Sequence, residues 1–584
     1  MTKEEGKLKI LGVNQINHGS KYHRVLLPLE AINGKTVKIG EKECVIEVSF
    51  TEFSKDLRLK EDHFKNYDVI YNHWLVPNDA IELSLWKNVY NTKFINDYDD
   101  TWDDKTHPYF SPTWEYGATR LAVLADFNTV ATKGLANKLE PYTDNIAIIP
   151  NLLPVGIGQF VGKPVEKGFK EGKLRIGFLG SFSHIPDLLN FKNVVNKLAK
   201  NKKIVENCQF TLVCDDSKEW GLVKSMFEKK KNLNFKTIPF KSVTEYMSLY
   251  DEFDVVIQPL VENEHNELKS GLKVIESSIK DCIFLGSKLY ERKEYPSYFK
   301  CELPIDYEKT LEFLLEEGNY VKYRDKVCAE NIAISKWENR VDFSTKLIET
   351  CYNQIEQTLE DVKIYSITYN DDQKTEYIRY DNSGIKTIEQ NSYLFEYNVI
   401  KDLIPKVEDE DYIGIFSYKF GNKTRLYKNL LNRLLVINNY KDYDIIGLSL
   451  KLFKGNYLEV SEEKHKGFTE LFGLICKDLN LIVKEPKNVI YSNQFLAKGK
   501  VYKQFLNEVI NPTIELLETK YKDLAWKDAG YIWGLKGEQL KEQTGLDYYP
   551  FHVFILERLL SVWLENKNMF SSNPVGSIKF MQLI

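Results

Sequence analysis

The sequence predicts an α/β protein with two doubly wound parallel halves, followed by a further α/β region. Short apolar runs alternate with helical segments through most of the chain, and a glycine-rich stretch at 155–173 interrupts this rhythm. The rhythm restarts at 174 and becomes less regular after Lys363. Because 584 residues are too many for one hydrophobic core, several domains are expected, with predicted boundaries at 1–160, 161–360 and 361–584.

The first half opens on the apolar run 8–13, which is typical of a buried parallel strand. A polar loop with Gly19 and Ser20 follows, and then a predicted helix over 22–32. Further strands are predicted at 44–49, 68–72, 93–97, 129–131 and 146–149. Strands that alternate with helices indicate a Rossmann-like domain with a parallel sheet covered on both faces.

The second half repeats the pattern, from a strand at 174–179 that leads into Gly180 and Ser181. Its other strands are predicted at 210–214, 235–239, 254–258 and 282–285. Its helices are predicted at 186–199, 243–250, 269–280 and 307–316, and a long helical stretch at 331–361 closes it. The third region begins with a strand at 363–369.

Composition excludes several classes of protein. The formal net charge is −5, which does not suit a general nucleic-acid binder. The eight cysteines form no CxxC pair, so reduced thiols are expected rather than disulfides or a zinc site. No apolar stretch approaches 18 residues, and the N-terminus lacks the apolar segment of a secretory signal. We expect a cytoplasmic protein without a transmembrane segment, and peripheral contact with the inner face of the membrane stays open.

Ligands of open α/β sheets sit at the carboxyl ends of the strands, so the loops there hold the candidate site. Gly19 would let a ligand approach the backbone, although an ordinary strand-to-helix turn explains it equally well. Gly180, Ser181 and His184 precede a helix and suit a diphosphate. The alternative is that Ser183 or Asp187 simply caps the helix.

The strongest cluster is the run PLVENEHNELKSGLKVIE at 259–276. Lys269, Lys273 and Glu276 stand at i, i+4 and i+7, so one helix face would carry two cations for phosphates and a carboxylate for ribose hydroxyls. Asn266 and Ser270 fall where the preceding loop meets the helix. A solvated amphipathic face is the alternative, and the position after an apolar strand favours the site.

An acidic stretch at 96–104 follows a strand of the first half. Asp99, Asp100 and the nearby His107 are candidate catalytic residues, with a carboxylate as base. Metal binding and simple helix capping are the alternatives, and a wall of the site is favoured over a metal. His73 and His107 are both expected in loops, and a structural role is the favoured alternative for each.

Together these pieces resemble the glycosyltransferase family 4 group of the GT-B fold, over about residues 8–355. The matching pieces are His18-Gly19-Ser20 with His23-Arg24 and Pro28, Ile95 to Asp100, Val130-Ala131-Thr132, Ile149-Pro150-Asn151, Ile176 to His184, and Pro259 to Glu276. The resemblance implies that Glu276 binds the donor ribose, that Lys269 and Lys273 neutralise the diphosphate, and that Gly180, Ser181 and His184 contact phosphates. It also implies that these two domains need no cofactor.

Two departures from the family pattern are visible. Many members have a glutamate eight residues before the ribose-binding one, where this chain has Leu268. The usual Arg/Lys pair after the first strand of the second half is replaced by Ser and His.

The region 361–584 resembles uncharacterised GT-A-like domains of bacterial capsular polysaccharide glycosyltransferases. The matching pieces are Tyr380-Asp381-Asn382, Asp411 to Phe420, Asp442 to Asp444, Tyr491 to Asn493 and Tyr549 to Leu559. Asp442 and Asp444 have the spacing of a metal-binding DxD motif, and an active GT-A-like domain would need Mg²⁺ or Mn²⁺. The alternative is that these aspartates only lead into a buried strand. Glu557 and Arg558, within an apolar helix, are expected to form a buried pair.

The sequence therefore predicts a glycosyltransferase that moves a sugar from a UDP- or GDP-type donor to a glycan or lipid-linked acceptor. The third region would make it bifunctional if it is active. The alternatives are an epimerase of the UDP-GlcNAc type, which shares the two-domain clamp, and a glycan-binding or scaffold protein without catalysis.

Overall fold

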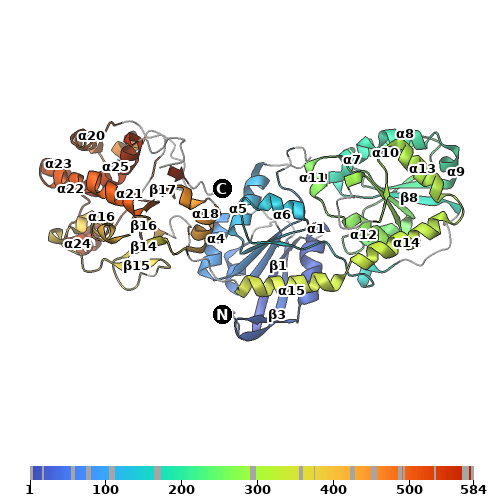
Figure 1. Ribbon diagram of the computed structural model, residues 1–584, viewed down its shortest axis with the longest axis horizontal. Coiled ribbons are helices and arrows are strands. Elements are labelled where there is room, and N and C mark those ends of the chain that lie inside the picture. The colour runs from blue at the N-terminus through green and yellow to red at the C-terminus, as the bar shows by residue number, and fades with distance from the viewer. Residues whose placement is uncertain are drawn as a thin grey trace. The chain divides into compact units, whose positions relative to one another are not determined.

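The computed structural model divides the chain into two compact units, residues 1–354 and 355–584 (Figure 1). It describes residues 4–15, 19–53, 59–73, 80–103, 105, 112–162, 172–289, 297–353, 359–373, 375–420, 426, 428–437, 439–448, 457–483, 489–490, 493–531, 534–567 and 578–580. The first unit holds two sheets and the second unit holds one.

The first sheet has seven strands in the order β2-β3-β1-β4-β5-β6-β7, and all of its pairs are parallel except β2 with β3. Its strands are β1 (Lys7–Gln15), β2 (Thr36–Ile39), β3 (Lys42–Phe53), β4 (Val69–His73), β5 (Lys93–Tyr98), β6 (Phe127–Val130) and β7 (Ile146–Ile148). Its helices are α1 (Gly19–Lys21), η1 (Tyr22–Leu26), α2 (Leu27–Ile32), α3 (Glu61–Asn66), α4 (Ala80–Val89), α5 (Pro112–Leu124) and α6 (Lys133–Leu139).

Strand β1 explains why this sheet is covered on both faces. Leu8 and Ile10 belong to one buried cluster, and Leu11 and Val13 belong to another. Successive side chains of a strand point to opposite faces, so a continuous apolar run needs a packed layer on each side.

The second sheet has six strands, all in parallel pairs, in the order β10-β9-β8-β11-β12-β13. Its strands are β8 (Leu174–Phe178), β9 (Cys208–Val213), β10 (Phe235–Ile238), β11 (Val255–Gln258), β12 (Ile283–Gly286) and β13 (Phe299–Lys300). Its helical elements include η2 (Gly158–Phe160), η4 (Phe182–His184), α7 (Ile185–Asn190), α8 (Lys192–Leu198), α9 (Lys202–Asn207), α10 (Lys218–Glu228), η5 (Tyr246–Glu252), α11 (Glu264–Leu268), α12 (Leu272–Ile279), α13 (Pro304–Leu314), α14 (Asn319–Ile334) and α15 (Trp337–Asn353).

The last helix of the second half returns to the first half. From α15, Val341, Leu347, Ile348 and Cys351 are buried in the same cluster as Leu8 of β1. Two Rossmann-like halves with this returning helix form the predicted GT-B fold, which is confirmed for the first unit. The predicted helical stretch at 331–361 consists of the end of α14 and the whole of α15, and β14 begins at Val362.

The second unit contains a mixed sheet in the order β15-β14-β16-β18-β17-β19, in which β18 runs antiparallel to both of its neighbours. Its strands are β14 (Val362–Thr368), β15 (Ile378–Asp381), β16 (Tyr412–Ser417), β17 (Ile445–Gly447), β18 (Phe495–Lys498) and β19 (Ile578–Phe580). Its helices include α16 (Glu396–Leu403), α18 (Lys428–Ile437), η10 (Tyr440–Asp442), α19 (Tyr457–Lys464), α20 (Phe468–Asp478), α21 (Gly499–Phe505), α22 (Asn511–Glu518), α24 (Gly537–Thr544) and α25 (His552–Asn566). The GT-A-like assignment of this unit stays a prediction.

Two smaller predictions concern buried side chains. All eight cysteines are free and buried. In α25 the predicted pair forms, with 2.9 Å between Arg558 Nη1 and Glu557 Oε2, but only Arg558 is buried and Glu557 is half-buried.

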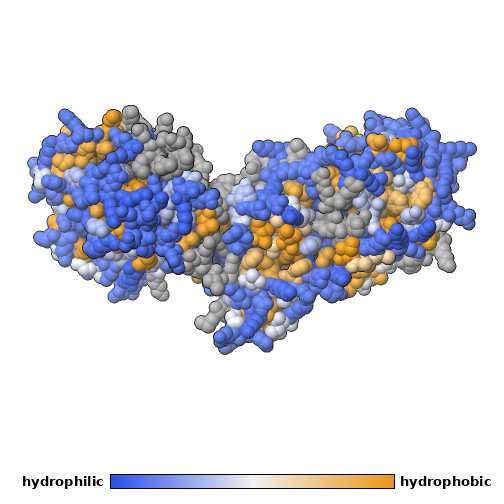
Figure 2. Space-filling view, in the orientation of Figure 1, coloured by the Kyte–Doolittle hydropathy of each residue, from blue (hydrophilic) through white to orange (hydrophobic). Residues whose placement is uncertain are grey.

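On the face that Figure 2 shows, hydrophilic side chains predominate and apolar ones gather in separate areas. Among the described residues, no helix combines the length and apolar character needed to cross a membrane.

Candidate functional site

The carboxyl ends of the two sheets in the first unit meet. Thr132 follows β6, and its Oγ1 donates to the carbonyl oxygen of Leu268 at 2.9 Å. Asn151 follows β7, and its Nδ2 donates to Ser270 Oγ at 2.9 Å. Leu268 and Ser270 both belong to the segment that follows β11. The edge where open α/β sheets bind ligands is therefore shared between the two halves.

The predicted helix over 269–280 is corrected in its first turn. Helix α11 ends at Leu268, and Lys269 has the extended backbone angles φ −63° and ψ 147°. Helix α12 starts only at Leu272, so Lys273 and Glu276 share a helix face and Lys269 does not belong to it. The break lets the Leu268 carbonyl accept the Thr132 hydrogen bond and lets Ser270 reach Asn151. Contacts with the first half thus compete with helix continuation here.

Lys273 and Glu276 form one buried polar cluster with two tyrosines of η5. Lys273 Nζ lies 2.9 Å from Glu276 Oε2, and the hydroxyl of Tyr250 donates to the same oxygen at 2.7 Å. Lys273 Nζ also hydrogen-bonds Tyr246 OH and lies 4.4 Å from the centroid of that ring. The Glu276 side chain is 1% exposed, and His23 of the first half faces it. Neither Lys273 nor Glu276 points into bulk solvent.

The charge state of this cluster follows from its contacts. Burial opposes the charged form of Lys273, but Glu276 and Tyr246 outweigh it and raise the pKa of the ammonium group. Burial raises the pKa of Tyr250, and Glu276 raises it further. Lys273 is therefore a cation at neutral pH, and Tyr250 is a neutral hydrogen-bond donor.

The loop after β8 brings together Gly180, Ser181 and His184. A Cβ atom on Gly180 would lie 2.8 Å from His184 Cδ2, so only glycine allows the ring to pack there. His184 Nδ1 lies 2.9 Å from Asp187 Oδ2, and Ser181 Oγ lies 2.7 Å from Ser183 Oγ. The predicted phosphate contacts of this loop stay predictions.

Asn266 is 3% exposed and connects α11 to α7. Its Nδ2 donates to Asp187 Oδ1 at 2.9 Å and to the Val261 carbonyl oxygen at 2.9 Å. Through Asp187, Asn266 is linked to His184. In the described arrangement Asn266 holds the two loops of the second half together, and its predicted contact with a nucleotide sugar stays a prediction.

The pKa of His184 gives a testable consequence. Burial, assisted by Lys269, lowers this pKa to about 4, from an unfolded value of 6.5. Because the folded state prefers the neutral ring, neutral His184 contributes fully to the free energy of unfolding above pH 6.5. This contribution is lost as the pH falls from 6.5 through about 4. Between pH 7 and pH 5, we expect the free energy of unfolding of wild type to fall by about 2 kcal/mol more than that of His184→Gln, whose side chain at this position cannot titrate.

The measurement compares thermal unfolding of the two proteins at both pH values. NMR of labelled histidine, assigned from the signal that His184→Gln lacks, gives the pKa directly. A measured pKa near 6.5 would contradict this expectation.

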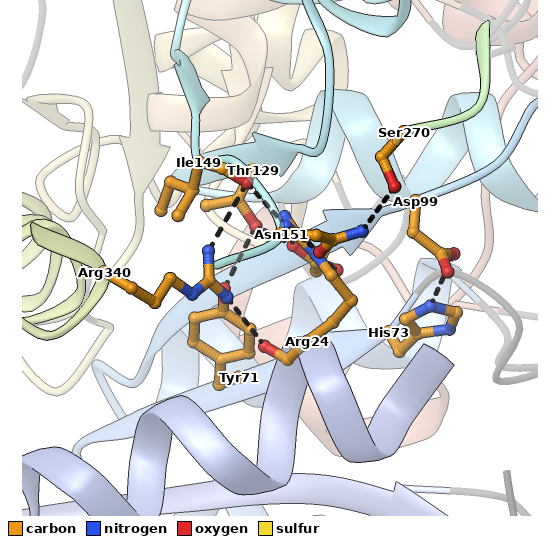
Figure 3. A network of polar contacts seen from close by, with 10 residues as sticks. Arg24, Tyr71, His73, Asp99, Thr129, Ile149, Asn151, Ser270 and Arg340 are labelled. Atoms are coloured by element: carbon orange, nitrogen blue, oxygen red, sulfur yellow. Dashed lines mark hydrogen bonds and ion pairs between the residues drawn. The ribbon is translucent and has the colours of Figure 1, made fainter. Parts of the chain in front are cut away.

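In the first half, a buried ion pair joins β5 to η1. Arg24 Nη2 lies 2.7 Å from Asp97 Oδ1, Arg24 Nε donates to Asp97 Oδ2 at 3.0 Å, and both side chains are 0% exposed. Arg24 Nη1 donates to Asn151 Oδ1 at 2.9 Å, and Asn151 in turn donates to Ser270. From α15, Arg340 Nη2 donates to the Arg24 carbonyl oxygen at 3.2 Å. Figure 3 shows how this network links the first half, the second half and the returning helix.

Asp99 follows β5 and pairs with His73. His73 Nε2 lies 3.0 Å from Asp99 Oδ1, and the ring is 0% exposed (Figure 3). His73 is the last residue of β4, which corrects the expectation of a loop histidine. Burial raises the pKa of Asp99, but His73 and a hydrogen bond from Ser20 outweigh this and lower it overall. Asp99 is therefore ionised at neutral pH.

The other first-half candidates lie near this pair or outside the described residues. Gly19 is exposed and begins α1, and Asp100 is half-buried beside Asp99. His107 lies outside the described residues, so its catalytic role stays a prediction.

Sequence reasoning assigned no role to four residues that build this site: Arg24, Asp97, Asn151 and His23. All four stand within the pieces that resemble the family, so a signal was present. Lys21 was also missed. It is 0% exposed, and burial lowers its pKa to about 8, although Asp99 opposes this.

In the second unit, Asp442 and Asp444 precede β17 instead of following a strand. Asp444 Oδ1 lies 2.9 Å from Lys498 Nζ, and Asp442 is exposed at the end of η10. This arrangement resembles the alternative in which the aspartates lead into a buried strand. Within the described ranges, no group of three or more His, Cys, Asp or Glu side chains is placed to hold a metal ion. The DxD metal role stays a prediction.

The similarity of this chain to known proteins lies in its fold. No protein-family model and no curated protein sequence matches the chain. Among solved structures, it is similar to HepE from Anabaena in complex with UDP and glucose, at 11% identity, with 59% of this chain and 99% of that chain covered and a TM-score of 0.43.

Two further solved structures are similar to the chain. For a glycosyltransferase from Rickettsia africae, the identity is 12%, the coverage 60% and 100%, and the TM-score 0.43. For sucrose-phosphate synthase from Thermosynechococcus elongatus, the identity is 12%, the coverage 59% and 99%, and the TM-score 0.43. These likenesses concern the fold.

Proposed function

We propose that the first unit is a glycosyltransferase that takes a sugar from a nucleoside diphosphate and transfers it to a glycan or lipid-linked acceptor. One observation supports this most: a cation and a carboxylate, Lys273 and Glu276, lie side by side at the shared carboxyl edge of two Rossmann-like sheets. A nucleoside diphosphate needs both, because its phosphates are anionic and its ribose hydroxyls are hydrogen-bond donors.

The chemistry of the proposed transfer follows from the charges. As the bond between the sugar and the diphosphate breaks, negative charge builds on the leaving diphosphate. Lys269 and Lys273 both act electrostatically on His184, so two cations lie within range of one loop. Preorganised cations in a water-poor cleft stabilise such a leaving group.

We further propose that Asp99 orients the acceptor hydroxyl. A carboxylate whose pKa is lowered is a weak base, so accepting a hydrogen bond suits Asp99 better than removing a proton early in the reaction. His73 holds the carboxylate in place at 3.0 Å. Asp100 and His107 remain candidates for the same step.

A ligand can reach the buried carboxylate of Glu276 only after a conformational change. Its side chain is 1% exposed, between Tyr250 and Lys273 of its own half and His23 of the other. A nucleotide sugar reaches this carboxylate only if the halves separate or the tyrosines move. Opening and closing of the halves would also keep water away from the donor during transfer.

A donor screen on the full chain tests the proposed function. The protein is incubated with UDP- and GDP-linked sugars, with and without candidate acceptors, and the release of UDP or GDP is measured. Release that depends on an acceptor is expected. Interconversion of the free donors would point to an epimerase, and absence of nucleotide binding at millimolar concentration would point to a non-catalytic protein. Lys269→Ala and Lys273→Ala should both slow release.

A further inference from the structure

Three consecutive residues of η1, Tyr22 to Arg24, contact three different parts of the first unit. Tyr22 OH accepts a hydrogen bond from Gln159 Nε2 at 2.8 Å and is buried in a cluster of second-half side chains. His23 faces Glu276, and Arg24 binds Asp97. The segment is a π-helix, a rare widened turn that often marks functional sites. One turn of the first half thus touches the candidate nucleotide site directly.

The His23 ring is held in place by aromatic packing, but its ring nitrogens are not fully hydrogen-bonded. Its side chain is 11% exposed and packs edge-to-face on Tyr22 and Phe160, with ring centroids 5.2 Å and 6.2 Å away. Its Nδ1 has no hydrogen-bond partner among the described residues. Burial lowers the pKa of His23, although Glu276 opposes this, so the ring is neutral at pH 7 and has one N–H donor.

Glu276 also has an unused acceptor on that side. Its Oε2 accepts from Tyr250 and Lys273, whereas its Oε1 lies 3.6 Å from His23 Nε2. That separation is too long for a good hydrogen bond. An N–H donor from one half and a carboxylate oxygen from the other therefore face each other without being joined.

We propose that His23 is a nucleotide-binding residue supplied by the first half, acting with Glu276 on the same ribose. This inference rests on the proposed function. A ribose hydroxyl is both donor and acceptor: it would donate to Glu276 Oε1 and accept from the Nε2–H of His23. Separation of the halves or movement of the tyrosines would admit the ribose, and the ligand would then satisfy both groups. Because the two residues come from different halves, nucleotide binding would also hold the halves together.

The experiment is isothermal titration calorimetry of the full chain with UDP, with GDP, and with the 2′,3′-dideoxy analogue of whichever binds more tightly. The variants are His23→Leu, which removes the donor, and His23→Gln, whose amide nitrogen can replace Nε2. Tyr22→Phe is the matched control, because it loses only the Gln159 hydrogen bond on the adjacent residue. Thermal unfolding of each variant checks the fold.

We expect His23→Leu to bind the nucleotide about 10-fold more weakly, as the loss of one well-placed hydrogen bond predicts. His23→Gln should recover most of the affinity, and Tyr22→Phe should match wild type. Wild type and His23→Leu should bind the dideoxy analogue with equal affinity, because the analogue lacks the hydroxyls that His23 would contact.

Two results would overturn the inference. If folded His23→Leu binds the nucleotide as tightly as wild type, His23 does not contact it, while the proposed function stands. If His23→Leu binds the dideoxy analogue more weakly than wild type by the same factor as it binds the nucleotide, His23 acts only through packing. Failure of wild type to bind either nucleotide would reject the proposed function together with this inference.

Discussion

Replacing Arg24 by methionine should lower the stability of the first sheet by about 3–5 kcal/mol. The guanidinium group and the carboxylate of Asp97 are both 0% exposed and joined through two hydrogen bonds. Removing the cation leaves the buried carboxylate with the hydrogen bond from Thr129 but without an opposite charge to offset its desolvation. The substitution also breaks the link through Asn151 to Ser270, so coupling between the halves should weaken.

Hydrogen exchange of backbone amides in β1, β4 and β5 measures this effect locally, which matters in a chain with more than one unit. Arg379→Met is the matched control, because Arg379 pairs with Asp371 at a surface where the side chains are 38% and 99% exposed. A surface pair contributes at most about 1 kcal/mol. Unchanged protection of β5 in Arg24→Met would show that the ion pair does not stabilise the sheet.

The second large effect is expected at Glu276. Glu276→Ala should weaken nucleotide binding by about 1–3 kcal/mol, roughly 5- to 150-fold, because two charge-assisted hydrogen bonds to ribose are lost. Glu276→Gln keeps the shape and an acceptor for Tyr250 but removes the charge, so it should show a smaller loss. Calorimetry with UDP and GDP measures both variants.

A control separates binding from folding, because the alanine variant also leaves the cation of Lys273 without its buried partner. Glu267→Gln, at an exposed position of α11, should bind nucleotide as wild type does. If Glu276→Gln is folded and its affinity equals that of wild type, the carboxylate does not bind ribose and the central role in the proposed site must be abandoned.

Much of the first unit could be predicted from local patterns. The apolar runs that predicted strands at 8–13, 93–97 and 254–258 correspond to β1, β5 and β11, with bounds that differ by at most two residues. Such runs are informative because a strand buried on both faces must be apolar throughout. The edge strand β2 was missed, since it pairs only with β3 and alternates between buried and exposed side chains.

The site was predicted less completely, for a physical reason that Lys269 illustrates. Its spacing to Lys273 and Glu276 fits a helix, but the chain leaves the helix at Lys269, where Leu268 and Ser270 bond to the first half. A pattern of local spacing contains no information on such partners, which lie more than a hundred residues away in the chain. The same holds for His73, whose buried contact with Asp99 depends on the pairing of β4 with β5.

By itself, the sequence determined the α/β class, the two Rossmann-like halves and the segments that follow their strands, because local periodicity and turn residues dictate these features. Only the tertiary structure decided that Glu276 is closed off between Tyr250, Lys273 and His23, and that Arg24 connects the halves through Asn151. The contacts of His23 and Arg24 join segments distant in the chain, and their strength comes from burial, which no single segment possesses before the halves pack together.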